Sequence, residues 1–176
     1  MPEGTVKVKP GRKPGRTVAA DQPWWLSLLL RGPAGSVPAR VALTAAILVG
    51  AALAAYSGYI HLYLWGRQPY PYKDVPTIGP LFLLQGIVAI LTGLLVAISR
   101  RLFAVIIGAG LMVVSVAALV IDVEVGMFGF KDSWSVPYAT STLYEEILGA
   151  VLLLIAAGVL AWPAVTGRSA RSVRAR

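Results

Sequence analysis

The feature that most constrains this fold is the distribution of charged residues along the chain, because it leaves four long uncharged stretches. No Asp, Glu, Lys or Arg occurs in residues 41–66, 75–99, 102–121 or 147–167. Each stretch has at least 20 residues. A helix of that length, rising about 1.5 Å per residue, crosses the roughly 30 Å hydrocarbon core of a bilayer. The sequence therefore predicts four transmembrane helices.

We expect an all-α membrane protein built as a four-helix transmembrane bundle. The expected helices lie near residues 41–65, 78–98, 102–123 and 143–162. They form one domain over residues 41–165, with a basic segment (1–40) before it and a basic tail (166–176) after it.

Basic residues gather on one side of the predicted membrane. Of the 16 Lys and Arg residues, 13 lie before the first helix, in the Arg100-Arg101 connection or in the C-terminal tail. Lys and Arg in short loops stay on the cytoplasmic side. Both termini are therefore predicted to be cytoplasmic (N-in/C-in), with the loops at 66–77 and 124–142 outside. The predicted location is the bacterial cytoplasmic membrane.

The segment before the first transmembrane helix has two parts. Residues 1–20 are rich in Lys, Arg, Pro and Gly, a composition typical of disorder. Near residues 22–31 we expect a short interfacial helix, with Asp21 as its cap and Trp24 and Trp25 at the membrane surface. A cleaved signal peptide is the alternative. It is disfavoured because a full spanning helix follows at once.

Several functional classes find no support in the sequence. The net charge of +8 is explained by topology and attraction to anionic lipid, so we expect the lipid bilayer and not nucleic acid as a partner. The absence of Cys excludes thiolate and iron–sulfur chemistry. Neither His-Glu-x-x-His nor Gly-x-Ser-x-Gly occurs. We therefore expect no catalytic residues, no metal and no cofactor.

The two outer loops carry most of the remaining sequence signals. All seven Tyr residues lie in or near them, a density higher than an interfacial aromatic belt requires. This predicts that the loops pack into an ordered cap. Each loop also contains Lys-Asp followed by Val-Pro, within residues 73–76 and 131–137. One hypothesis is that the two helical hairpins arose by duplication as a parallel repeat.

Each predicted helix has one polar residue on its small-residue face, in the outer half of the membrane. These residues are His61, Gln85, Asp122 and Glu146. Polar groups at this depth are costly and mark either a partner or a function. The first interpretation is that His61 bonds to a carboxylate or hydroxyl and ties the helices together. The second is an outward-open polar pocket. A metal site ranks last, because one His with carboxylates is a poor ligand set.

Three segments carry a resemblance to a known family. Residues 60–65 read Ile-His-Leu-Tyr-Leu-Trp, residues 75–85 read Val-Pro-Thr-Ile-Gly-Pro-Leu-Phe-Leu-Leu-Gln, and residues 129–132 read Gly-Phe-Lys-Asp. They resemble an uncharacterised actinobacterial family of four-helix integral membrane proteins, over about residues 41–161. The resemblance implies no activity. It does imply that the outer-facing segments are the family's distinctive part.

For function, the sequence favours a non-enzymatic accessory or scaffold subunit that binds another membrane protein or a second copy of itself. The alternative is an outward-facing protein that binds or transports a proton, an ion or a small ligand. A membrane enzyme ranks third. The two leading hypotheses differ on whether the four polar side chains pack together or face a cavity.

Overall fold

A computed structural model of the protein describes residues 23–67 and 71–174, with side chains as far as Trp162. Four of its helices are long and apolar enough to cross a membrane. They are α2 (Val37–Gly66), α3 (Ile78–Ser99), α4 (Leu102–Glu124) and α5 (Ala139–Arg174), accompanied by a short α1 (Trp24–Leu29) and a 3-10 turn, η2 (Tyr72–Asp74). The predicted all-α, four-helix membrane fold is confirmed.

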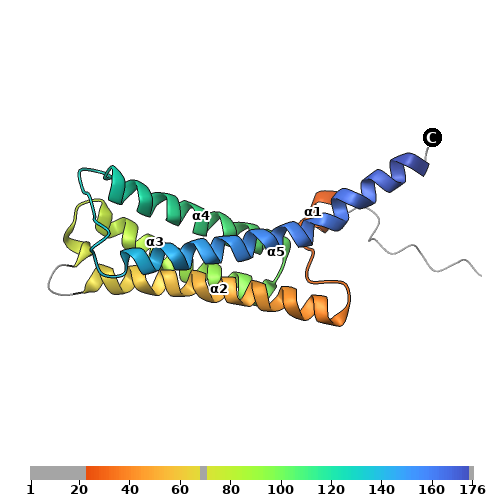
Figure 1. Ribbon diagram of the computed structural model, residues 1–176, viewed down its shortest axis with the longest axis horizontal. Helices are drawn as coiled ribbons and strands as arrows, with labels where there is room; N and C mark the ends of the chain where they lie inside the picture. Colours follow the sequence, from red (N-terminus) through yellow and green to blue (C-terminus); the bar gives the residue numbers. More distant parts are fainter. Residues whose placement is uncertain (1–22, 68–70, 175–176) are drawn as a thin grey trace, which may run out of the picture.

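The four long helices lie side by side (Figure 1). The α2–α3 and α4–α5 loops meet at one end of the bundle, called the loop end below. The start of α2 and the α3–α4 turn lie toward the opposite end, the basic end, together with α1. By the charge distribution, the loop end is the side predicted to face outward.

Two helices are longer than the sequence predicts. Helix α2 begins at Val37, with Pro38 in its first turn, where the fixed backbone angle of proline suits a helix start. Helix α5 runs from Ala139 to Arg174, of which Ala139–Trp162 is apolar enough to span a membrane. The membrane-spanning part therefore ends at the predicted residue 162, and the helix itself continues beyond it. Hydropathy marks where a helix leaves the membrane, and Ala and Arg can continue it in water.

The short helix α1 lies within the range predicted for an interfacial helix. Its N-cap is Pro23, while Asp21 and the segment 1–20 lie outside the described residues. Two hydrogen bonds attach the end of α1 to the α3–α4 turn: the Leu102 amide donates to the Arg31 carbonyl at 2.8 Å, and the Arg101 guanidinium donates to the Leu30 carbonyl at 2.7 Å.

Glycines allow α2 and α3 to approach each other closely. A Cβ at Gly58 would lie 2.6 Å from the carbonyl oxygen of Gly86, and a Cβ at Gly93 would lie 2.7 Å from that of Ala51. Backbone contact of this kind is a main source of helix association in lipid. The small residues of the first hairpin are therefore part of its interface.

Helix α5 lies between α2 and α4. Gly50 of α2 and Gly108 of α4 both face the fully buried side chain of Leu153 on α5. Helices α3 and α4 contact each other less extensively than the α2–α3, α4–α5 and α2–α5 pairs do. The weakest seam of the bundle is therefore between α3 and α4, which are held together by a tight turn at the basic end.

The structure extends the repeat suggested by the two Lys-Asp motifs. When these two motifs are aligned, helix α2 aligns with helix α4. Several buried residues of α2 then fall opposite buried residues of α4. The matched buried pairs are Ile47/Val105, Gly50/Gly108, Ala51/Ala109, Ala54/Met112 and Ser57/Ser115. A shared inward face over this length supports the duplication hypothesis.

The starts of α3 and α5 also match. Residues 133–135 are an insertion in the second loop, after which both loops read Val-Pro. The next residues, Thr77 and Tyr138, have φ angles of 66° and 72°. Each then accepts a hydrogen bond from the amide four residues later, Leu81 or Thr142. In this alignment Gln85 and Glu146 occupy equivalent positions.

We expect Gly93→Ala to destabilise the bundle, because the added methyl group would press on the α2 backbone. Overpacking of this kind costs about 1–3 kcal/mol. The control is Gly110→Ala, since nothing lies within 4 Å of a Cβ at Gly110. Thermal unfolding of both variants in detergent measures the difference. Equal melting temperatures for the two variants would contradict this packing.

Candidate functional site

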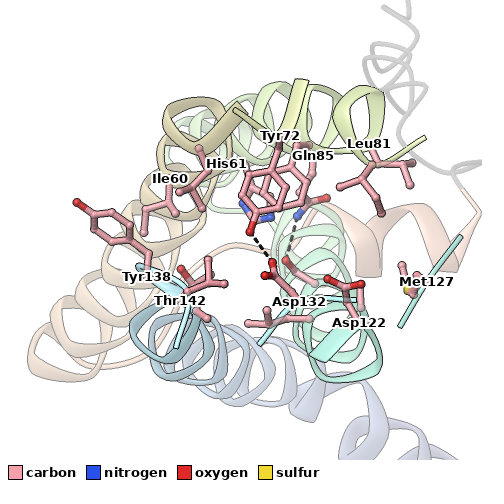
Figure 2. A pocket seen from close by; sticks show the side chains of 18 of the residues that line it. Ile60, His61, Tyr72, Leu81, Gln85, Asp122, Met127, Asp132, Tyr138 and Thr142 are labelled. Atoms are coloured by element: carbon pink, nitrogen blue, oxygen red, sulfur yellow. Dashed lines mark hydrogen bonds between the residues drawn. The ribbon is translucent and has the colours of Figure 1, made fainter. Parts of the chain in front are cut away.

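A cavity of about 310 Å³ lies at the loop end of the bundle. Its walls come from all four long helices and from both loops (Figure 2). The four residues singled out in the sequence, His61, Gln85, Asp122 and Glu146, all line it. The structure therefore brings them together around one space, each from a different helix.

Glu146 is the most deeply buried polar residue of this cavity, with an exposed fraction of 0%. One of its oxygens, Oε1, accepts hydrogen bonds from the hydroxyls of Ser57 at 2.7 Å and Ser115 at 2.5 Å. Its other oxygen, Oε2, is buried and has no hydrogen-bond partner. One oxygen of this carboxylate is thus held by two serine hydroxyls, and the other is buried without a partner.

Gln85 connects helix α3 to this hydrogen-bond network. Its side-chain amide donates to the Ser115 hydroxyl at 3.2 Å. In the repeat alignment Ser57 matches Ser115 and Glu146 matches Gln85. The Ser57–Glu146 contact between α2 and α5 is therefore repeated by the Ser115–Gln85 contact between α4 and α3. The polar network lies where the two hairpins meet.

His61 is bonded differently from the first interpretation of the sequence. Its Nδ1 lies 2.9 Å from the backbone carbonyl of Ser57, one turn earlier in α2, and its ring packs 5.0 Å from that of Phe82. A carbonyl only accepts, so Nδ1 donates. Within the described residues His61 bonds to no carboxylate or hydroxyl. The expected tie was wrong because the ring bonds within its own helix.

Two more cavity residues have buried oxygens without partners. They are Oδ1 of Asp122 and Oγ1 of Thr142. Asp122 is 9% exposed near the end of α4, and Thr142 lies in the first turn of α5. Of the four side-chain oxygens that are buried without a partner in the described residues, three therefore belong to residues that line this cavity. The fourth, Oε1 of Glu145, does not.

The two loops close over the cavity through Tyr72 and Asp132. The Tyr72 hydroxyl donates to Asp132 at 2.5 Å, as Figure 2 shows. The Tyr72 ring stacks on Phe82 at 4.3 Å and meets Phe130 edge-on at 5.9 Å. Burial, and next the hydrogen bond to Asp132, raise the pKa of Tyr72 above its ordinary value. The hydroxyl therefore stays protonated and continues to donate.

Sequence reasoning missed the roles of Ser57, Ser115, Tyr72 and Asp132. A serine on a small-residue face looks like any other packing residue. The available signal was the repeat, because Ser57 and Ser115 match once Lys73-Asp74 is aligned with Lys131-Asp132. The contact between Tyr72 and Asp132 joins the two loops. It depends on the conformation of these loops, which the sequence pattern does not predict.

The chemistry of the cavity is apolar and acidic. Its described lining residues include three carboxylates, those of Asp122, Asp132 and Glu146, and no Lys or Arg. Aromatic rings from both loops and from α3 contribute much of the wall. No group of three His, Cys, Asp or Glu side chains is close enough to hold a metal ion among the residues described. A largely apolar hollow with a few polar groups is typical of small-molecule sites.

We predict that Tyr72→Phe opens the cap without unfolding the bundle, since it removes the bond to Asp132 and keeps the ring stack. A hydrogen bond to a charged group contributes about 1.5–3 kcal/mol. Amide hydrogen exchange in residues 130–137 should therefore accelerate by about tenfold or more. Tyr59→Phe, at an exposed tyrosine, is the control. Unchanged exchange in Tyr72→Phe would show that this bond does not hold the loops.

Comparisons with protein-family models, curated proteins and solved structures find no match. The resemblance to an actinobacterial membrane protein family therefore stays a prediction. The case for a function depends on the geometry of the loop-end cavity.

Proposed function

We propose that this multi-pass membrane protein binds a small organic cation in the loop-end cavity. The observation that carries the proposal is that Glu146 lines the cavity while its Oε2 is buried without a hydrogen-bond partner among the described residues. The proposed location is the bacterial cytoplasmic membrane, with the cavity on its outer side. Both of these follow from the charge distribution.

The unpartnered oxygens favour binding over a purely structural role. A buried polar group without a partner costs about 1–3 kcal/mol, so side chains that only join helices are expected to satisfy one another. Here Glu146, Asp122 and Thr142 all line the same cavity, and each has one buried side-chain oxygen without a partner. A ligand with N–H or O–H groups would satisfy these acceptors.

The charge and the rings of the cavity favour a cation. Three carboxylates line it, and His61 is the one basic side chain among its described lining residues, so the lining favours a cation over an anion. Tyr72, Phe82 and Tyr138 add aromatic rings, and ring faces attract cations. The cavity of about 310 Å³ is much larger than an inorganic ion. Of the proton, ion or small ligand expected from the sequence, an organic amine therefore fits best.

The position of the cavity agrees with this role. It lies where two repeated hairpins meet, beside the α3–α4 seam. Transporters built from repeats place their ligand sites at the corresponding interface. The accessory or scaffold role stays a prediction. Stable co-purification with another membrane protein would support it.

A panel of three fragments tests the proposal: benzylammonium, benzyl alcohol and benzoate. The full chain is placed in lipid nanodiscs and titrated by calorimetry, with empty nanodiscs as the blank. We expect saturable binding of benzylammonium that is lost in Ala118→Phe, which fills the cavity, and kept in Ala117→Phe. Ala118 lines the cavity and its neighbour Ala117 is exposed. Ala118→Leu replaces Ala118→Phe if the larger ring prevents folding.

Replacement of Glu146 by Gln tests whether binding depends on the positive charge of the ligand. Glu146→Gln should weaken benzylammonium binding by at least about tenfold, as expected when a buried charge loses its partner, and leave benzyl alcohol unchanged. Glu145→Gln is the matched control, because Glu145 does not line the cavity. Equal binding of all three fragments would contradict selectivity for a cation, although the cavity would still be a binding site. If no fragment distinguishes the wild type from Ala118→Phe, the binding function itself is rejected.

A further inference from the structure

A second hollow lies at the basic end of the bundle, and it shares no lining residue with the loop-end cavity. It is formed by three segments that meet there: the α1–α2 linker, the first turns of α2 and the α3–α4 turn. Its volume is about 690 Å³ and it is more open than the loop-end cavity. We propose that this hollow binds an anionic phospholipid.

The charged part of this hollow consists of three arginines. Arg40 comes from the start of α2, and Arg100 and Arg101 come from the α3–α4 turn. The described lining residues include no Asp or Glu. Arg40 and Arg100 are exposed, and planar guanidinium groups bind phosphate oxygens in pairs. The arginines therefore form a phosphate-binding rim.

The apolar lining of the hollow favours a lipid over a soluble phosphate compound as its ligand. Val37, Val41, Thr44, Ala45 and Leu48 line the hollow and share one face of α2. From Val37 to Leu48 this face extends roughly 16 Å along the helix axis. Val37 and Val41 are each 62% exposed and Leu48 is 42% exposed. A stripe of this length continues from the rim toward the membrane interior and can hold the first part of an acyl chain.

The position at the basic end strengthens this assignment. Among the described residues, Arg31, Arg40, Arg100 and Arg101 lie at this end, which the charge distribution predicts to be cytoplasmic. Anionic lipids are attracted by about 1 kcal/mol per basic residue near a membrane surface. Arg101 also holds the Leu30 carbonyl at 2.7 Å. A phosphate at the rim would therefore sit beside the contact that attaches α1 to the α3–α4 turn.

The test titrates the full chain in detergent with dioleoyl phosphatidylglycerol, dioleoyl phosphatidylcholine and glycerol 1-phosphate. Native mass spectrometry measures bound lipid. We expect phosphatidylglycerol to bind about tenfold or more tightly than phosphatidylcholine, with two or more basic contacts as its source. Glycerol 1-phosphate should bind much more weakly. Equal binding of the two lipids, or full affinity for glycerol 1-phosphate, would overturn the assignment to an anionic lipid.

Variants separate the built site from a general effect of charge. Arg40→Gln and Arg100→Gln should each weaken phosphatidylglycerol binding about fivefold. Arg31→Gln, which removes the same charge at the same end but does not line the hollow, should change it little. Val41→Asn should weaken both lipids by disrupting the apolar stripe. A loss in Arg31→Gln equal to that in Arg40→Gln would overturn the site.

Discussion

The buried carboxylate of Glu146 is the constraint on which the rest of this structure depends. A charge-bearing group in the apolar part of a bundle is tolerated only when donors are fixed around it. Ser57 and Ser115 supply them from two other helices. Both serines reach the same oxygen because small residues let the helices pack closely. Gly50 and Gly108, for example, both pack against Leu153, closer to the middle of the bundle. Close packing in the middle of the bundle thus positions the polar layer.

The duplication hypothesis would explain why the polar layer has this composition. Two copies of a hairpin provide the two equivalent serines. Divergence at one position, Gln85 in the first copy and Glu146 in the second, leaves a single carboxylate between them. The extra residues 133–135 lengthen the second loop, and Asp132 just before them reaches Tyr72 of the first. The cavity therefore lies between two similar hairpins that differ at these positions.

The sequence predicted the four helices and the residues that meet at the cavity, because uncharged length and helical periodicity are local properties. Its errors have physical causes. Hydropathy could not show that α5 continues to Arg174, and periodicity could not show that His61 bonds to its own helix. The bond between Tyr72 and Asp132 depends on loop geometry. Whether the polar residues line a space or fill it depends on how the four helices and both loops pack around them, which no local pattern specifies.

We thus propose a ligand site in the cavity at the loop end and a lipid site in the arginine-lined hollow at the basic end. The central claim is that the free oxygen of Glu146 accepts from a bound cation. An experimental structure of the protein with benzylammonium tests it most directly. The account predicts the ammonium group within hydrogen-bond distance of Glu146 Oε2 and the ring among Tyr72, Phe82 and Tyr138. A structure in which Oε2 bonds to another protein group, with the cavity closed, would contradict it.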